Sequence, residues 1–230
     1  MRRAPAAWPG LRAAWLAGAL LAGALLPGPA FTQPAAAVDP AALLQSVLAT
    51  PADAARGKAA FDDCSGCHRR DASGRAGSKI PRLSGQHASV IVKQILDIRS
   101  GLRNNPPMKP LVDEAVLPLQ AIADIASYLS GLPITGALVK GPGSDLARGQ
   151  QLYARDCVAC HGAAGEGQAA LQVPMLAAQH YPYLLRELDL IRDGARGNSN
   201  PTMAALVRGY APADLQAVAD YLAQLPAPKR

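Results

Sequence analysis

The hydrophobic residues of this chain recur mainly every three or four positions, which is the pattern of helices that bury one face. Residues 119–132 and 212–225 show it most clearly. Two other segments, about 88–101 and 183–194, end with basic residues and a glycine, as helix C-termini commonly do. No segment shows a good alternation of apolar and polar residues, which a half-buried strand would show. The pattern therefore predicts an all-α fold.

Two more helices are predicted before residues 64 and 157. Thr50 is a candidate N-cap, Pro51 suits a first turn, and Asp53 can act as the acid of a capping box. A helix is therefore expected from this point to Cys64. Residues 144–156 repeat the arrangement.

The N-terminal segment, residues 1–37, has the pattern of an export signal. Arg2, Arg3 and Arg12 precede an apolar run at 13–26, and small residues follow it. The whole segment contains no acidic residue. Cleavage after Ala30 or after Ala37 is compatible with this pattern, and Ala37 is favoured. A membrane-spanning helix needs about 20 apolar residues, more than this run holds. We therefore expect a cleaved signal peptide and a soluble mature protein in the periplasm.

The remainder of the chain is a tandem repeat. The motif that begins at Cys64 recurs at Cys157, 93 residues later, and the segment 80–87 returns as 173–180 at the same offset. Near Met108 the offset becomes 95, since its counterpart is Met203, and it then returns to 93. The expected organisation is a first domain at 48–135, a Gly/Pro-rich linker at 136–143 and a second domain at 144–230. The two domains are called the first and second repeats below.

Each repeat carries a glycine four residues before an aromatic residue in its first helix. Such a glycine allows close approach of a second helix, with the ring packed beside it. Tyrosines of the final helices are the expected partners. The residues are Gly57, Phe61 and Tyr128 in the first repeat and Gly149, Tyr153 and Tyr221 in the second.

The composition excludes several classes of protein. Half of the residues are hydrophobic, which excludes intrinsic disorder. The formal net charge of +6 is scattered along the chain and does not resemble a nucleic-acid footprint. Four cysteines are too few for a disulfide scaffold of 230 residues. Only 4% of the residues are aromatic, so a planar cofactor would supply bulk that the core lacks.

The duplicated motif is Cys-x-x-Cys-His, the attachment signature of c-type haem. Two thiols three residues apart can both reach the vinyl groups of one porphyrin, and the adjacent imidazole faces the iron. A redox dithiol and half of a zinc site are the alternatives. Both are less favoured, because no strand accompanies the motif and zinc would leave the histidines unexplained. The predicted attachment sites are Cys64 and Cys67, and Cys157 and Cys160, with His68 and His161 as iron ligands.

The sixth iron ligand is predicted to be Met108 in the first repeat and Met203 in the second. Both lie in Pro-rich segments expected to be irregular, although core packing is the alternative role. Met175 has Arg82 at the equivalent position of the first repeat, so the repeat gives it no equivalent role, and it is expected to pack in the core. His87 and His180 could provide bis-histidine ligation, but partly exposed positions at helix starts are expected instead.

These features together resemble the di-haem cytochrome c4 family, over about residues 51–226. The resemblance implies two class I cytochrome c domains whose haems face one another across a pseudo-twofold interface, and electron carriage in the periplasm. It also implies that the carbonyls of Pro81 and Pro174 accept the second N–H of the proximal histidines. Some members of the family are associated with membranes, so the resemblance is also compatible with peripheral membrane association of this protein.

The function predicted from the sequence is electron transfer by two covalently bound haems. The partners would be a quinol-oxidising complex and a terminal oxidase or reductase. The alternative is the electron-accepting subunit of a periplasmic dehydrogenase, such as a sulfide-oxidising flavocytochrome. A di-haem peroxidase or thiosulfate-oxidising enzyme is less favoured, because each iron has a methionine available. Four arginines could pair with haem propionates or lie at solvated helix ends, namely Arg99, Arg103, Arg192 and Arg196.

Overall fold

The computed structural model describes residues 39–75, 77 and 79–228. The predicted signal peptide lies outside these residues. The described part of the chain is helical and has no strand; isolated antiparallel bridges join residue 75 to 80 and residue 168 to 173. The prediction of an all-α fold is confirmed. Within the described ranges, no helix has the length and apolar character needed to cross a membrane.

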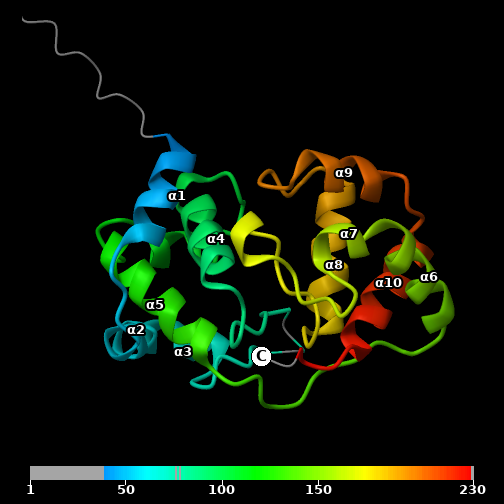
Figure 1. Ribbon diagram of the computed structural model, residues 1–230, viewed down its shortest axis with the longest axis horizontal. Helices are drawn as coiled ribbons and strands as arrows, with labels where there is room; N and C mark the ends of the chain where they lie inside the picture. Colours follow the sequence, from blue (N-terminus) through cyan, green and yellow to red (C-terminus); the bar gives the residue numbers. More distant parts are fainter. Residues whose placement is uncertain (1–38, 76, 78, 229–230) are drawn as a thin grey trace, which may run out of the picture. The chain divides into compact units, whose positions relative to one another are not determined.

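The first repeat and the helix that leads into it contain five α-helices and one short 3₁₀ helix among their described residues, coloured from blue to green in Figure 1. They are α1 (Pro40–Ala49), α2 (Ala54–Ala60), α3 (Asp62–His68), α4 (Ala88–Ser100), η2 (Lys109–Val112) and α5 (Leu119–Gly131). Helices α1, α2 and α4 all pack against α5. Their buried aliphatic side chains form one core cluster, the first core.

The second repeat has a similar set of elements, coloured from yellow-green to red in Figure 1. They are α6 (Leu146–Asp156), α7 (Val158–His161), η3 (Ala169–Leu171), α8 (Tyr181–Arg192), α9 (Pro201–Arg208) and α10 (Pro212–Gln224). Helix α10 packs against α6 and α8, and α8 also packs against α9. A separate cluster of buried apolar side chains, the second core, lies among them.

The predicted helix from Thr50 to Cys64 is wrong in two respects. Asp53, not Thr50, is the N-cap, because its Oδ1 accepts hydrogen bonds from the backbone N–H groups of Ala55 and Arg56 at 2.7 and 2.9 Å. The helix also ends before Phe61, and a separate helix, α3, carries the cysteine motif.

Helix α1 was not predicted, and most of it precedes the expected start of the first domain at residue 48. Leu44 and Val47 are buried in the first core, where α1 contacts α4 and α5. Asp39 caps the helix and Pro40 occupies its first turn. The first core is therefore larger than the repeated sequence alone suggests.

The close helix crossings predicted from the glycines are confirmed. A Cβ atom at Gly57 would lie 2.0 Å from the carbonyl oxygen of Asp124 in α5, and one at Gly149 would lie 2.1 Å from that of Ala217 in α10. Only a residue without a side chain permits backbones to approach so closely. The predicted ring pairs also form, with centroid separations of 5.9 Å for Phe61 and Tyr128 and 5.7 Å for Tyr153 and Tyr221.

The two repeats contact one another through reciprocal hydrogen bonds. The side-chain amide of Gln86 accepts from the backbone N–H of Met175 at 3.0 Å and donates to its carbonyl at 2.9 Å. Gln179, 93 residues after Gln86, makes the same two bonds to Arg82 at 3.0 Å each. Arg82 is in turn 93 residues before Met175. Equivalent residues exchange equivalent bonds, which is the pattern of an interface with approximate twofold symmetry.

His87 and His180 extend this interface. Nε2 of His87 lies 2.8 Å from the carbonyl oxygen of Glu166, and Nε2 of His180 lies 2.8 Å from that of Ser73. Because a carbonyl oxygen can only accept, both Nε2 atoms donate. The prediction of partly exposed helix-start histidines is wrong for His180, which is buried. These contacts also leave neither Nε2 atom available for bis-histidine ligation.

Candidate functional site

The Cys-x-x-Cys-His motif lies on one short helix in each repeat. In the first repeat α3 carries Cys64, which is half-buried, Cys67, which is exposed, and His68, which is buried. In the second repeat Cys157 caps α7, and Cys160 and His161 lie within it, with the same order of exposure. Each motif therefore presents its second thiol at the surface and its imidazole inside the protein.

The two buried histidines have the same orientation. Nδ1 of His68 lies 3.2 Å from the carbonyl oxygen of Pro81, and Nδ1 of His161 lies 3.1 Å from that of Pro174. The carbonyl can only accept, so Nδ1 carries the proton and Nε2 keeps its lone pair. Burial lowers the pKa of both imidazoles. A neutral imidazole held through its other N–H is the form that binds a metal.

The two candidate methionines pack in the same cores as the motifs. Met108 and Cys64 both contact the first core, and Met203 and Cys157 both contact the second. Met108 lies in the turn that precedes η2, as expected. The prediction of an irregular segment is wrong for Met203, which lies in the first turn of α9. Asn200 caps this helix by accepting from the backbone N–H of Met203 at 3.3 Å.

The cysteines do not have the character of a redox dithiol. No disulfide joins any of the four cysteines. Burial raises the pKa of Cys64 and raises that of Cys157 to about 11. A reactive dithiol needs the opposite, a thiolate stabilised by a lowered pKa. Among the described residues, no three His, Cys, Asp or Glu side chains lie close enough together to hold a metal ion such as zinc.

The donor set fits a c-type haem in each repeat. Two thiols lie within one helical turn, a buried neutral imidazole follows them, and a thioether packs against the same core. The thiols supply sulfur for covalent attachment, and His with Met is a known pair of axial ligands for haem iron. In each repeat the first cysteine of the motif and the candidate methionine thus contact the same core.

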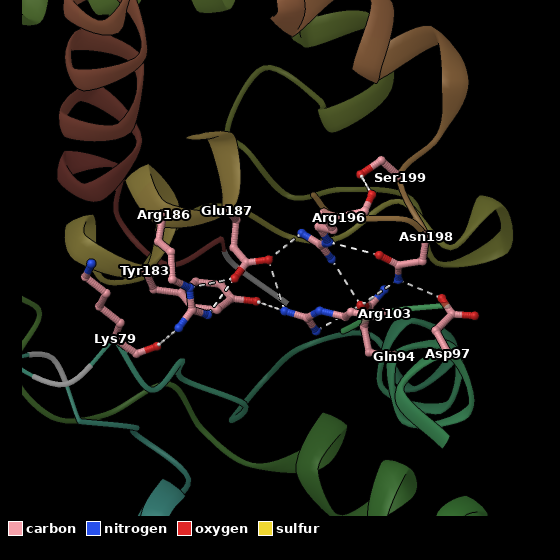
Figure 2. A network of polar contacts seen from close by, with 10 residues as sticks. All are labelled: Lys79, Gln94, Asp97, Arg103, Tyr183, Arg186, Glu187, Arg196, Asn198 and Ser199. Carbon is pink, nitrogen blue, oxygen red and sulfur yellow. Dashed lines mark hydrogen bonds and ion pairs between the residues drawn. The ribbon is translucent and has the colours of Figure 1, made fainter. Parts of the chain in front are cut away.

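The four candidate arginines have different surroundings. Arg99 donates to the carbonyls of Val112 and Leu117. Arg192 pairs with two acidic residues at the end of α8, as expected of a helix end. Arg103 and Arg196 are instead largely buried, and both bind Glu187 (Figure 2). Their pairing with propionates stays a prediction, but they do not lie at solvated helix ends.

Sequence reasoning did not assign a role to Gln86, Gln179 or Glu187. The glutamines were noted only as part of the repeated segment, although their offset of 93 residues was the signal that could have placed them at an interface. Glu187 gave no signal of this kind, because its counterpart in the first repeat is the neutral Gln94.

Comparison with known proteins extends this picture. The cytochrome c family model matches twice, at residues 54–133 and 146–226. A protein of Stutzerimonas stutzeri (strain A1501) named thiosulfate dehydrogenase electron acceptor is 36% identical over 201 residues, covering 80% of this chain and 92% of that protein. Cytochrome c4 of Azotobacter vinelandii is 32% identical over 188 residues, covering 74% of this chain and 88% of the relative.

The solved structures agree with the sequence comparison. Reduced recombinant cytochrome c4 from Pseudomonas stutzeri superposes with a TM-score of 0.68 at 25% identity, covering 76% of this chain and all of that one. Two cytochrome c domains imply two covalently bound haems and a role in electron transfer. The chain belongs to the cytochrome c family, and within it to the di-haem cytochromes c4.

Proposed function

We propose that each repeat of this protein binds one haem through its own Cys-x-x-Cys-His motif and supplies its own methionine as the sixth ligand of the iron. Thioether bonds would form at Cys64 and Cys67 in the first repeat and at Cys157 and Cys160 in the second. The axial ligands would be His68 with Met108, and His161 with Met203. The observation that carries this proposal is the matched pair of buried histidines, each oriented by a proline carbonyl.

The role that fits these sites best is electron carriage. The haems supply a one-electron iron couple, and His/Met ligation favours a high reduction potential. Pro81 and Pro174 fix the tautomer and orientation of the histidines through their carbonyls. With Met108 and Met203 as sixth ligands, neither iron would have a free position for a substrate, and the apolar cores would exclude water. These residues therefore favour transfer of electrons over chemistry on a bound molecule.

The proposed location is the periplasm, after removal of residues 1–37. The proposed partners are a quinol-oxidising complex as donor and a terminal oxidase or reductase as acceptor. N-terminal sequencing of the exported protein tests the location, and a chain that begins at Val38 is expected. Retention of the apolar run would instead support membrane attachment.

A second candidate is the acceptor of electrons from a periplasmic dehydrogenase. The specific observation that favours it is the relative in Stutzerimonas stutzeri, whose name describes a thiosulfate dehydrogenase electron acceptor and which is covered over 92% of its length. A direct test mixes the oxidised protein with thiosulfate dehydrogenase and thiosulfate, or with a quinol-oxidising complex and quinol. The faster reduction identifies the physiological class of donor.

The ligand assignment is tested by replacing each methionine with histidine in the holoprotein. In Met108→His and in Met203→His we expect half of the near-infrared sulfur-to-iron band to disappear. An unchanged band would remove that methionine from the site. Binding of carbon monoxide to one reduced haem of the unmodified protein would instead support an enzyme with an open iron, such as a peroxidase.

A further inference from the structure

Four side chains form a closed ring of polar contacts between the two repeats, called the square below (Figure 2). Arg103 and Glu187 are buried, and Gln94 and Arg196 are half-buried. Arg103 donates to Oε1 of Gln94 at 2.9 Å and to Oε2 of Glu187 at 3.0 Å. Arg196 donates to the same Gln94 oxygen at 3.0 Å and lies 2.8 Å from the same Glu187 oxygen. Each arginine therefore holds one acceptor in its own repeat and one in the other.

The square is built from two equivalent pairs. Glu187 occupies the position 93 residues after Gln94, and Arg196 the position 93 residues after Arg103. Gln94 lies in α4, and Glu187 lies in the equivalent helix α8. The geometry obeys the pseudo-twofold relation of the repeats, but the charge does not, because only one of the two acceptors is ionised.

The single carboxylate is surrounded by positive charge. Arg186 also binds Glu187, at 2.5 Å, so that three guanidinium groups converge on one acid. Burial tends to raise the pKa of Glu187, but the charges of Arg103, Arg196 and Arg186 outweigh it and lower the pKa. The carboxylate of Asp97, three residues after Gln94, is already paired with Lys93 and accepts from Asn198, which also donates to Gln94.

Because these side chains are shielded from water, the carboxylate is needed to balance the positive charge of the arginines. The side chains of Arg103 and Glu187 are 10% and 8% exposed, and that of Arg196 is 15% exposed. Removing one partner from such a buried ion pair leaves the remaining charges without compensation. Without the carboxylate, three cations would face one another at the junction of the repeats, and separation of the repeats would relieve the repulsion.

We propose that Glu187 is a positioning residue: through Arg103 and Arg196 it clamps the second repeat to the first and so fixes the relative orientation of the two haems. The proposal rests on the haem sites proposed above for its consequence in electron transfer. The clamp itself does not depend on them, because all of its contacts are between protein side chains.

The test exploits the symmetry of the square. Glu187→Gln removes the carboxylate but keeps the shape and gives both repeats a glutamine. The double variant Gln94→Glu with Glu187→Gln moves the carboxylate to the opposite corner, where Arg103 and Arg196 reach it equally well. Asp189→Asn is the matched control, because it removes a negative charge from the same helix at an ion pair that stays within that helix.

Two readouts separate the clamp from the haem assignment. Amide hydrogen exchange at Arg82 and Met175 reports on the interface and needs no haem signal, because the N–H of each is bonded to a glutamine of the other repeat. The excitonic couplet in the Soret circular dichroism of the holoprotein reports on the relative orientation of two haems. A protein that lacks haem absorbance would refute the proposed function and leave the exchange measurement valid.

In Glu187→Gln we expect exchange at Arg82 and Met175 to be about tenfold faster or more, which corresponds to about 1.4 kcal/mol, and the couplet to shrink. The double variant should return both readouts most of the way to those of the unmodified protein, because Arg103 and Arg196 regain a carboxylate while Arg186 does not. Asp189→Asn should leave both readouts unchanged. Arg103→Lys, which retains the charge but cannot span both acceptors, is a milder variant, with about threefold faster exchange expected.

Either of two results would overturn the clamp. One is exchange in Glu187→Gln that matches exchange in Asp189→Asn. The other is a double variant no better than Glu187→Gln, which would show that the carboxylate does not act through both arginines. If Glu187→Gln does not accumulate as a folded protein, Arg103→Lys decides the matter, and unchanged exchange at Arg82 and Met175 in that variant refutes the proposal.

Discussion

A methyl group added at Gly149 tests whether the crossing of α6 and α10 determines the stability of the second repeat. The new Cβ of Gly149→Ala would lie 2.1 Å from the carbonyl oxygen of Ala217 and 2.8 Å from Cβ of Tyr221, whereas ordinary contacts are 3.4–4 Å. The carbonyl belongs to the backbone of α10 and cannot rotate away. The two helices must therefore separate by roughly 1 Å, as overpacked cores do.

The change in the free energy of unfolding is the overpacking cost less the gain in helix propensity. Overpacking of this kind costs about 1–3 kcal/mol, and the movement also loosens Leu152 and Tyr153, each only 1% exposed. Alanine recovers about 1 kcal/mol through its better helix propensity. Because the displaced neighbour is backbone, we place the overpacking cost at the upper end of its range. The expected net loss in the free energy of unfolding is about 2 kcal/mol.

Unfolding in guanidinium chloride, followed by helical circular dichroism, measures this difference. The matched control is Gly131→Ala at the end of α5, where an added Cβ meets nothing within 4 Å. That variant should be unchanged or more stable by up to about 1 kcal/mol. If Gly149→Ala were as stable as the unmodified protein, or if both variants lost the same amount, the account of the close crossing would be refuted.

Two other predictions concern the interface and a buried acid. Gln179→Ala should lower the free energy of unfolding by about 1–3 kcal/mol, because the buried backbone N–H and carbonyl of Arg82 lose their partners. Gln172→Ala is the control, because the side chain of Gln172 donates to the nearby carbonyl of Ala170 within the same turn; it should have almost no effect, and equal losses in denaturant titration would contradict the prediction. Asp124 accepts hydrogen bonds from Arg56, which chiefly lower its pKa below the ordinary value of 3.8. Its ionised form therefore stabilises the fold fully above about pH 4, and this contribution is lost as the pH falls through the lowered pKa. Asp124→Asn should accordingly show a flatter decline of unfolding free energy with pH below 4, and a decline as steep as in the unmodified protein would exclude this role.

Much of the local structure was predictable because it depends on residues close together in the chain. Three- and four-residue periodicity places α5 and α10, and basic residues with a C-terminal glycine place α4 and α8, all within one or two residues of their observed ends. The glycines at 57 and 149, each four residues before an aromatic residue, indicate the close crossings, because a missing side chain lets two backbones approach. The duplicated motif predicts the haem chemistry, and its spacing alone determines which thiols and imidazole share a helical turn.

Other features depend on contacts between residues far apart in the chain. Periodicity shows that a helix buries one face but not which element covers it, so neither the packing of α1 on α4 and α5 nor the burial of His180 was predicted. The role of Glu187 has the same origin, because only the packing of the repeats brings Arg103 to it across 84 positions. The sequence by itself determined the repeats, most of the helices and the motif chemistry. The tertiary structure alone decided how the repeats are joined, because the spacing of residues along the chain does not show which side chains meet across an interface.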